Sequence, residues 1–174
     1  MNIYLCGLIG SGKTSIGKEI AKRLQWSFFD VDQIMEKEAE KRIHDIVAGE
    51  GWVSYREREY NICKRLSKLD HAVVAFAGGT VRYEWNVDVS KGTGVTVLLN
   101  ARIPLLVQRA IRHDRPRVNP VGSLKEDLSL LWKKYKDRYQ GAADLIYRTD
   151  RNKTVKEEAE EIIGILRKKK LFVS

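Results

Sequence analysis

The sequence predicts an α/β fold in which helices cover both faces of a central parallel sheet, giving three layers in the order α/β/α. Short apolar runs that suit buried strands alternate along the chain with amphipathic stretches that suit helices. No stretch rich in proline, glycine or serine divides the 174 residues. We therefore expect a single domain, residues 1–174, that is long enough to enclose a substantial core.

The first apolar run, residues 2–8, is followed by a glycine-rich loop and by an amphipathic helix that ends near Leu24. The spacing G-x-x-x-x-G-K-[ST] is met here by Gly7, Gly12, Lys13 and Thr14. A helix that starts after a strand and a tight loop presents backbone N–H groups, and its dipole adds positive charge at the same point. The sequence thus predicts a phosphate-binding loop (P-loop) and a nucleotide ligand.

The P-loop assignment gives a set of expected nucleotide contacts. Lys13 is expected to reach the outer phosphates, and the hydroxyl of Thr14 is expected to ligate Mg²⁺. The residues expected to contact the nucleotide here are Gly10, Ser11, Gly12, Lys13, Thr14 and Ser15. ATP and Mg²⁺ are accordingly the predicted cofactors. An ordinary glycine-rich turn is the alternative, and the strand and helix around the loop argue against it.

The remaining elements follow from the same two patterns. Strands are expected at residues 27–30, 72–77, 95–99 and 145–147, each a short apolar run. Helices are expected at residues 32–40, 50–68, 103–111, 124–139 and 155–169. Residues 114–122 hold two of the three prolines and show no periodicity, so we expect a mobile lid at about residues 112–123.

Ligands of such a sheet bind beyond the carboxyl ends of its strands. This rule brings together residues 7–14, 30–32 and 77–80 and the loop near His113. Asp30 and Asp32 lie two apart at the end of an expected strand, so both side chains should leave on the same side. In phosphoryl transfer one carboxylate can serve the metal while another orients the attacking hydroxyl. The alternative is that Asp32 merely caps the next helix.

Three further stretches have both a functional and an ordinary explanation. Arg56 could bind a substrate carboxylate through its planar guanidinium, or it could pair with the acidic residues around it on a helix surface. Gly78 and Gly79 could offer bare backbone N–H groups to a substrate, or they could form only a turn. Arg115, in the expected lid, could close onto the transferring phosphoryl group, or it could simply be solvated.

Composition narrows the classes of partner. The formal net charge of +9 suits a polyanionic ligand, and no basic stretch interleaved with aromatic residues supports a nucleic-acid partner. Two cysteines make neither a disulfide framework nor a metal site, which suggests a reducing compartment. No apolar run is long enough for a membrane span, and no secretory signal is recognised. We expect a cytoplasmic protein without a membrane partner.

Taken together, these motifs resemble the shikimate kinase family, small P-loop kinases with the fold of the nucleoside monophosphate kinases. The resemblance rests on the P-loop at residues 7–14, DxD at 30–32, GE…[FY]RxxE across 49–59, the glycine pair at 78–79 and Arg-Pro at 115–116. It implies ATP-dependent phosphorylation of shikimate to shikimate 3-phosphate, on the pathway to aromatic amino acids. The enzyme is expected to be a monomer whose partners are small molecules.

The resemblance also implies residue roles. On the acceptor side, Asp32 would bind and orient the attacking hydroxyl, and Arg56 would bind the shikimate carboxylate. Gly78 and Gly79 would line the same pocket, and Asp30 would support the Mg²⁺ shell.

On the nucleotide side, the resemblance implies that Arg109 stacks on adenine, once one residue of gap is allowed in the alignment. Lys153 and Arg115 are assigned to the ATP site as well. The implied catalytic residues are Lys13, Asp32 and Arg115.

The chain departs from the family pattern at three places. Ala77 stands first in the usual triple glycine, and residues 117–118 of the lid read Arg-Val where the family has two leucines. Tyr135 stands where the family has an arginine that also binds the shikimate carboxylate. Arg138 or Lys134 could take over that contact, although neither is in the family's register.

These departures leave two other functions open. One is a kinase of another small carboxylated or polyhydroxylated metabolite. The other is a nucleotide-binding module without catalysis, and the presence of both Asp30 and Asp32 argues against it because a nucleotide sensor needs no carboxylate on the acceptor side.

Overall fold

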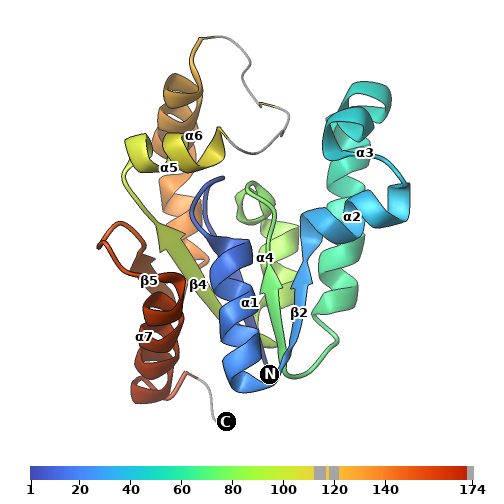
Figure 1. Cartoon of the computed structure of the whole chain (residues 1–174). Coiled ribbons are helices and arrows are strands. Elements are labelled where there is room, and N and C mark those ends of the chain that lie inside the picture. Colours follow the sequence, from blue (N-terminus) through green and yellow to red (C-terminus); the bar gives the residue numbers. More distant parts are fainter. Residues whose placement is uncertain (112–116, 118–121, 172–174) are drawn as a thin grey trace.

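A five-stranded parallel sheet forms the middle layer of the molecule, with strand order β2-β3-β1-β4-β5 (Figure 1). This computed structural model describes residues 1–111, 117 and 122–171. The strands are β1 (Asn2–Cys6), β2 (Ser27–Asp30), β3 (Ala72–Ala75), β4 (Gly94–Asn100) and β5 (Leu145–Arg148). The helices are α1 (Lys13–Leu24), α2 (Val31–Ala39), α3 (Ile43–Leu66), the 3-10 turn η1 (Thr80–Arg82), α4 (Glu84–Ser90), α5 (Ile103–Ala110), α6 (Leu124–Gly141) and α7 (Val155–Lys168).

Alternate residues of the central strand β1 enter two separate cores. Ile3 and Leu5 pack with apolar residues of α1 and α7 on one face of the sheet. Tyr4 and Cys6 pack on the other face, in a core to which α2, α3, α5 and α6 contribute. Because side chains alternate across a strand, a strand buried on both faces is apolar on both, as residues 3–6 are here. The buried Asn2 at the start of β1 is hydrogen-bonded to the backbone of Leu69 and Ala72. The predicted three-layer α/β/α fold is confirmed.

Several element boundaries differ from the sequence-based prediction. β1 ends at Cys6 rather than residue 8, and β3 ends at Ala75 rather than residue 77. The helix expected at 50–68 starts earlier, because two helices meet across a kink at Gly51, where φ is 79° and ψ is 172°. The helix α4 was not predicted, since its seven residues are too few to show a helical period.

The carboxyl ends of the strands lead into the segments predicted to carry the site. The P-loop follows β1, Asp30 ends β2, and Gly78 and Gly79 follow β3. Most of the predicted lid, residues 112–116 and 118–121, lies outside the described residues, so its mobility stays a prediction. None of the helices in the described ranges combines the length and the apolar character of a membrane-spanning segment.

Candidate active site

The loop between β1 and α1 leads directly into the N-terminus of that helix. Gly10 and Gly12 have φ values of 80° and 98°, in the left-handed region that glycine adopts most easily. A Cβ at Gly10 would lie 2.4 Å from the carbonyl oxygen of Leu106, so the loop packs directly against α5. The N-cap of α1 is Gly12, which has no side chain that could cap the helix. The N–H groups of its first turn are therefore placed to bind an anion such as phosphate.

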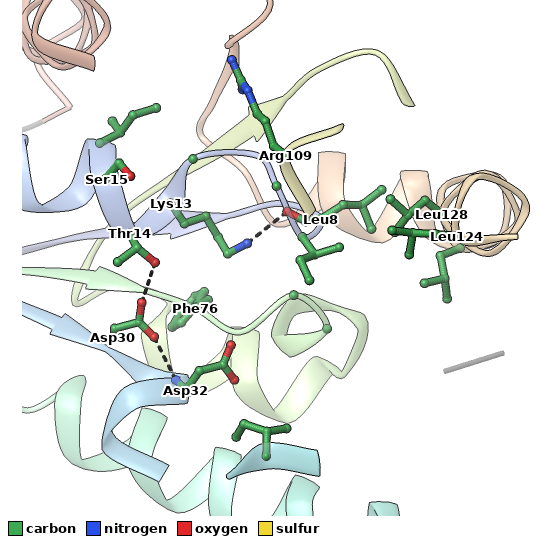
Figure 2. Close-up of a pocket in the computed structure, with 18 of the residues that line it drawn as sticks. Leu8, Lys13, Thr14, Ser15, Asp30, Asp32, Phe76, Arg109, Leu124 and Leu128 are labelled. Atoms are coloured by element: carbon green, nitrogen blue, oxygen red, sulfur yellow. Dashed lines mark hydrogen bonds between the residues drawn. The ribbon is translucent and has the colours of Figure 1, made fainter. Parts of the chain in front are cut away.

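Lys13 lies across the P-loop (Figure 2). Its Nζ donates to the carbonyl oxygens of Gly7 at 2.9 Å and Leu8 at 3.1 Å, which holds the ammonium beside the loop. Ser15 is exposed at the start of α1, whereas Ser11 is fully buried beneath the loop. The Ser11 hydroxyl has no hydrogen-bond partner among the described residues. Of the predicted loop contacts, Ser11 can therefore offer a nucleotide its backbone more readily than its side chain.

Thr14 and Asp30 are joined by a hydrogen bond across two elements (Figure 2). The Thr14 hydroxyl donates to Asp30 Oδ2 at 2.7 Å. The other oxygen, Asp30 Oδ1, accepts from the N–H groups of Asp32 at 3.1 Å and Gln33 at 3.3 Å. Asp30 is thus the N-cap of α2, and the alternative that Asp32 caps this helix is wrong. The pair presents a hydroxyl and a carboxylate beside the P-loop, which are hard ligands of the kind Mg²⁺ prefers.

Asp32 is the second residue of α2, so it belongs to the helix expected at residues 32–40 and not to the strand whose alternation was used to place its side chain. The strand-alternation argument for its direction was therefore wrong, yet the side chain still lines the same cavity as Asp30. Its Oδ1 accepts from the Tyr55 hydroxyl at 3.2 Å. Burial, and then the Asp32 charge, raise the pKa of Tyr55 well above its usual value, so the phenol stays protonated and donates.

Arg56 is held from several sides on α3. Its Nη1 donates to the fully buried carboxylate of Glu59 at 2.8 Å, and its Cζ lies 4.7–5.3 Å from the ring centroids of Trp52, Tyr55 and Tyr83. Burial is the largest effect and lowers the pKa of Arg56, but Glu59, Tyr55 and Tyr83 together outweigh it, so the pKa is raised. The side chain is only 12% exposed, so the surface ion-pair explanation is wrong.

One cavity of about 590 Å³ connects these groups. Within the described ranges, the predicted site residues that line it are Gly10, Gly12, Lys13, Thr14, Ser15, Asp30, Asp32, Arg56, Gly78, Gly79, Arg109 and Lys153. Ser11 is the described exception, and Arg115 lies outside the described residues.

Arg109 and Lys153 reach the cavity from different elements. Arg109, on α5, donates to the Thr149 hydroxyl at 3.3 Å and to its carbonyl oxygen at 3.0 Å. Lys153 follows β5 and pairs with Glu161 at 2.8 Å. The two bring positive charge to the same cavity as the P-loop. Arg117, within the expected lid, also lines this cavity and bonds Asp127 at 3.5 Å.

Comparison with known proteins gives a consistent answer. The family profile described as shikimate kinase matches residues 9–167. The chain belongs to the shikimate kinase family. A shikimate kinase from Syntrophus aciditrophicus is 36% identical, over 93% of this chain and 89% of that protein. One from Coxiella burnetii is 38% identical, over 86% of this chain and 84% of that protein.

Solved structures agree with the family assignment. A shikimate kinase from Acinetobacter baumannii, in complex with shikimate, superposes with a TM-score of 0.92 at 29% identity and covers 98% of this chain and 95% of that chain. A deoxyadenosine kinase from M. mycoides shares the fold alone, with a TM-score of 0.61 at 18% identity. As a member of the shikimate kinase family, the chain is an ATP-dependent kinase.

The substitution at Tyr135, which sets this chain apart from the shikimate kinase pattern, has a structural context. Arg138, one suggested replacement, pairs with Glu84 on the surface, and Lys134 lies over the Tyr135 ring. Neither lines the cavity. An arginine that does line it, Arg82, was not singled out from the sequence. Its position three residues after Gly79 was the available signal.

Proposed function

We propose that this chain transfers the γ-phosphoryl group of ATP to a hydroxyl of shikimate, giving shikimate 3-phosphate and ADP. The observation that carries the proposal is the single cavity that is lined both by the P-loop and by Asp32 and Arg56. Phosphoryl transfer needs donor and acceptor groups in one enclosed site. Family membership supports the same reaction.

The P-loop binds the phosphates of ATP. Backbone N–H groups and the positive end of α1 meet the phosphate oxygens, and Lys13 adds a full charge. These groups stabilise negative charge that is spread over the transferring phosphoryl group in a loose transition state. Lys13 already lies beside the loop, so little rearrangement is needed to place it.

The Thr14–Asp30 pair fits a Mg²⁺ site. Mg²⁺ is usually bound by one or two protein oxygens together with phosphate oxygens and water. Among the described residues no cluster of three histidine, cysteine, aspartate or glutamate side chains could hold a metal by itself, so phosphates would complete this site. When bound, the ion neutralises charge on the phosphates.

Asp32 and Arg56 act on the acceptor. The Asp32 carboxylate accepts a hydrogen bond from the attacking hydroxyl and orients it toward the phosphoryl group. Tyr55 fixes Asp32 through its hydrogen bond, and Glu59 fixes Arg56. Arg56 uses the remaining N–H groups of its guanidinium for the shikimate carboxylate, since this planar group matches a carboxylate in shape.

Further roles complete the proposal. Arg109 stacks on adenine, Lys153 contributes to ATP binding, and Arg115 closes over the transferring phosphoryl group from a mobile lid. The enzyme acts as a monomer in the cytoplasm, and the two buried free cysteines suit a reducing compartment.

Release of ADP in the presence of Mg-ATP tests this function. The expected result is ADP release that depends on shikimate and is much slower with other carboxylated or polyhydroxylated metabolites. Faster turnover of one of those metabolites would reassign the acceptor. Binding of ATP without turnover of any acceptor would favour a nucleotide-binding module.

A further inference from the structure

Arg82 presents unused hydrogen-bond donors at the cavity. It ends η1, directly after the glycine turn, and lines the cavity. Its Nε donates to the Tyr139 hydroxyl at 3.1 Å, and its Nη2 donates to the carbonyl oxygen of Gly78 at 3.3 Å. A guanidinium has five N–H donors. The other donors of Arg82 have no bond to any residue that the structure describes.

The Arg82 guanidinium and the Arg56 guanidinium meet at Gly79. A Cβ on Gly79 would lie 3.0 Å from Arg56 Nη2 and 3.2 Å from Arg82 Cζ. Two cations from different elements, α3 and η1, therefore lie on the same side of Gly79, next to the place that a Cβ would occupy. Glycine at this position leaves room for both groups, and both also lie close enough to Tyr139 to lower its pKa against the larger, opposing effect of burial.

The charges of the two arginines are balanced differently. Arg56 is paired with the buried carboxylate of Glu59. In the described part of the chain, Arg82 has only neutral partners: a phenol, a peptide carbonyl and the face of the Tyr135 ring, whose centroid lies 5.3 Å from Cζ. A partly buried cation without a carboxylate partner favours an anionic ligand, and two adjacent guanidinium groups suit a carboxylate.

We propose that Arg82, together with Arg56, binds the carboxylate of the acceptor, and that Tyr135 positions Arg82 by stacking on it. This inference rests on the proposed function. The Tyr135 ring belongs to α6, and the Arg82 that it stacks on belongs to η1. The second positive charge at the carboxylate therefore comes from η1 rather than from α6. Tyr139 orients the same guanidinium from the next turn of α6.

Steady-state kinetics of Arg82→Ala test the proposal. We expect the KM for shikimate to rise about tenfold to a hundredfold, which corresponds to one lost charged hydrogen-bonding group. The KM for ATP should stay within about twofold. Arg138→Ala is the matched control, because it removes the same charge from an arginine that pairs with Glu84 on the surface, and it should leave both constants unchanged.

The methyl ester of shikimate separates a carboxylate contact from a general effect on the pocket. If Arg82 binds the carboxylate, Arg82→Ala should weaken turnover of shikimate much more than turnover of the ester. An equal loss for both acceptors would overturn the proposal. A rise in the KM for ATP without a rise for shikimate would also overturn it, because it would assign Arg82 to the phosphates.

Three further variants keep the test valid if Arg82→Ala does not fold. Arg82→Gln retains most of the side-chain length and a donor for the Gly78 carbonyl, and it should give the same preference between acid and ester. Tyr135→Leu should raise the shikimate KM several-fold with little change in kcat, and Tyr135→Phe, which keeps the ring, should restore it. An unchanged KM in Tyr135→Leu would remove the positioning role.

The outcomes for Arg82 and for the proposed function can be told apart. A wild-type protein that releases no ADP with shikimate would overturn the proposed function, and the assignment of Arg82 with it. An active wild-type protein whose shikimate KM is the same in Arg82→Ala and Arg82→Gln would overturn the assignment of Arg82 alone.

Discussion

Lys13 is the residue whose role depends most on charge and least on packing. Its ammonium contacts two loop carbonyl oxygens and contributes little to either core. Lys13→Ala should therefore abolish turnover while the protein stays folded, because the phosphates lose the ammonium that lies beside the P-loop. The measurement is the rate of ADP release, with circular dichroism to confirm folding. Lys22→Ala, an exposed position on the same helix, should turn over normally, and normal turnover by Lys13→Ala would refute the P-loop role.

Asp32 is expected to act through its charge at the acceptor hydroxyl. Asp32→Asn keeps the shape of the side chain, and we expect kcat to fall at least about a hundredfold, as is typical when a general base or positioning group is removed. Part of that loss should be positional, since a loose transition state needs little help from a base. The exposed Asp137→Asn controls for loss of one negative charge. An unchanged kcat in steady-state assays would assign the role to another residue.

At the scale of single residues, the P-loop contacts were predictable because they depend on a short spacing, residues 7–14, within one loop. Asp30 as the cap of α2 was not, since only the final geometry decides which of two aspartates meets the free N–H groups. Tyr55 and Arg82 were missed for a related reason. Their roles come from contacts across 23 residues to Asp32 and 57 residues to Tyr139. A local pattern shows that Arg82 follows the glycine turn, but it does not show these contact partners.

At the scale of elements, α1 packs so tightly on the sheet that one added methyl group should change the free energy of unfolding. A Cβ at Gly17 would lie 2.6 Å from Phe28 Cε2 and 3.0 Å from Leu5 Cδ1, whereas one at Gly164 in α7 would meet nothing within 4 Å. Alanine gains about 1 kcal/mol over glycine in a helix interior. Overpacking a core costs about 1–3 kcal/mol.

The same substitution should therefore have opposite signs in the two helices. Gly164→Ala should raise the free energy of unfolding by about 1 kcal/mol. Gly17→Ala should lower it, because the clash exceeds the gain in helix propensity. Urea denaturation of both variants measures the difference. A stabilised Gly17→Ala would show that α1 can move away from β2 without cost.

Elements with a clear period were predicted to within a few residues, and elements without one were not. The strand 27–30 matches β2 at both ends, because an apolar pair lies between a turn and a capping aspartate. The start of α3, residues 43–49, was missed because Gly51 interrupts the helix with a conformation that no helical residue adopts. Sequence periodicity cannot reveal a helix that is joined to another through such a kink.

At the scale of the whole molecule, the sheet was predictable in type but not in order. Alternating strands and helices imply a parallel sheet, yet they leave open which strand is central. The order β2-β3-β1-β4-β5 places β1 in the middle, so that the P-loop lies between the segments that follow β3 and β4. That placement allows one cavity to contain groups from the P-loop, α2, α3, α5 and the loop after β5.

The central claim is that the protein transfers a phosphoryl group from ATP to shikimate within this cavity. The most direct test is to incubate the protein with Mg-ATP and shikimate and to quantify ADP and phosphorylated shikimate by mass spectrometry. We expect the two products in equal amounts, with little ADP when shikimate is omitted. ADP that forms with free phosphate and without phosphorylated shikimate would contradict the account, as would the absence of both products in a preparation shown to bind Mg-ATP.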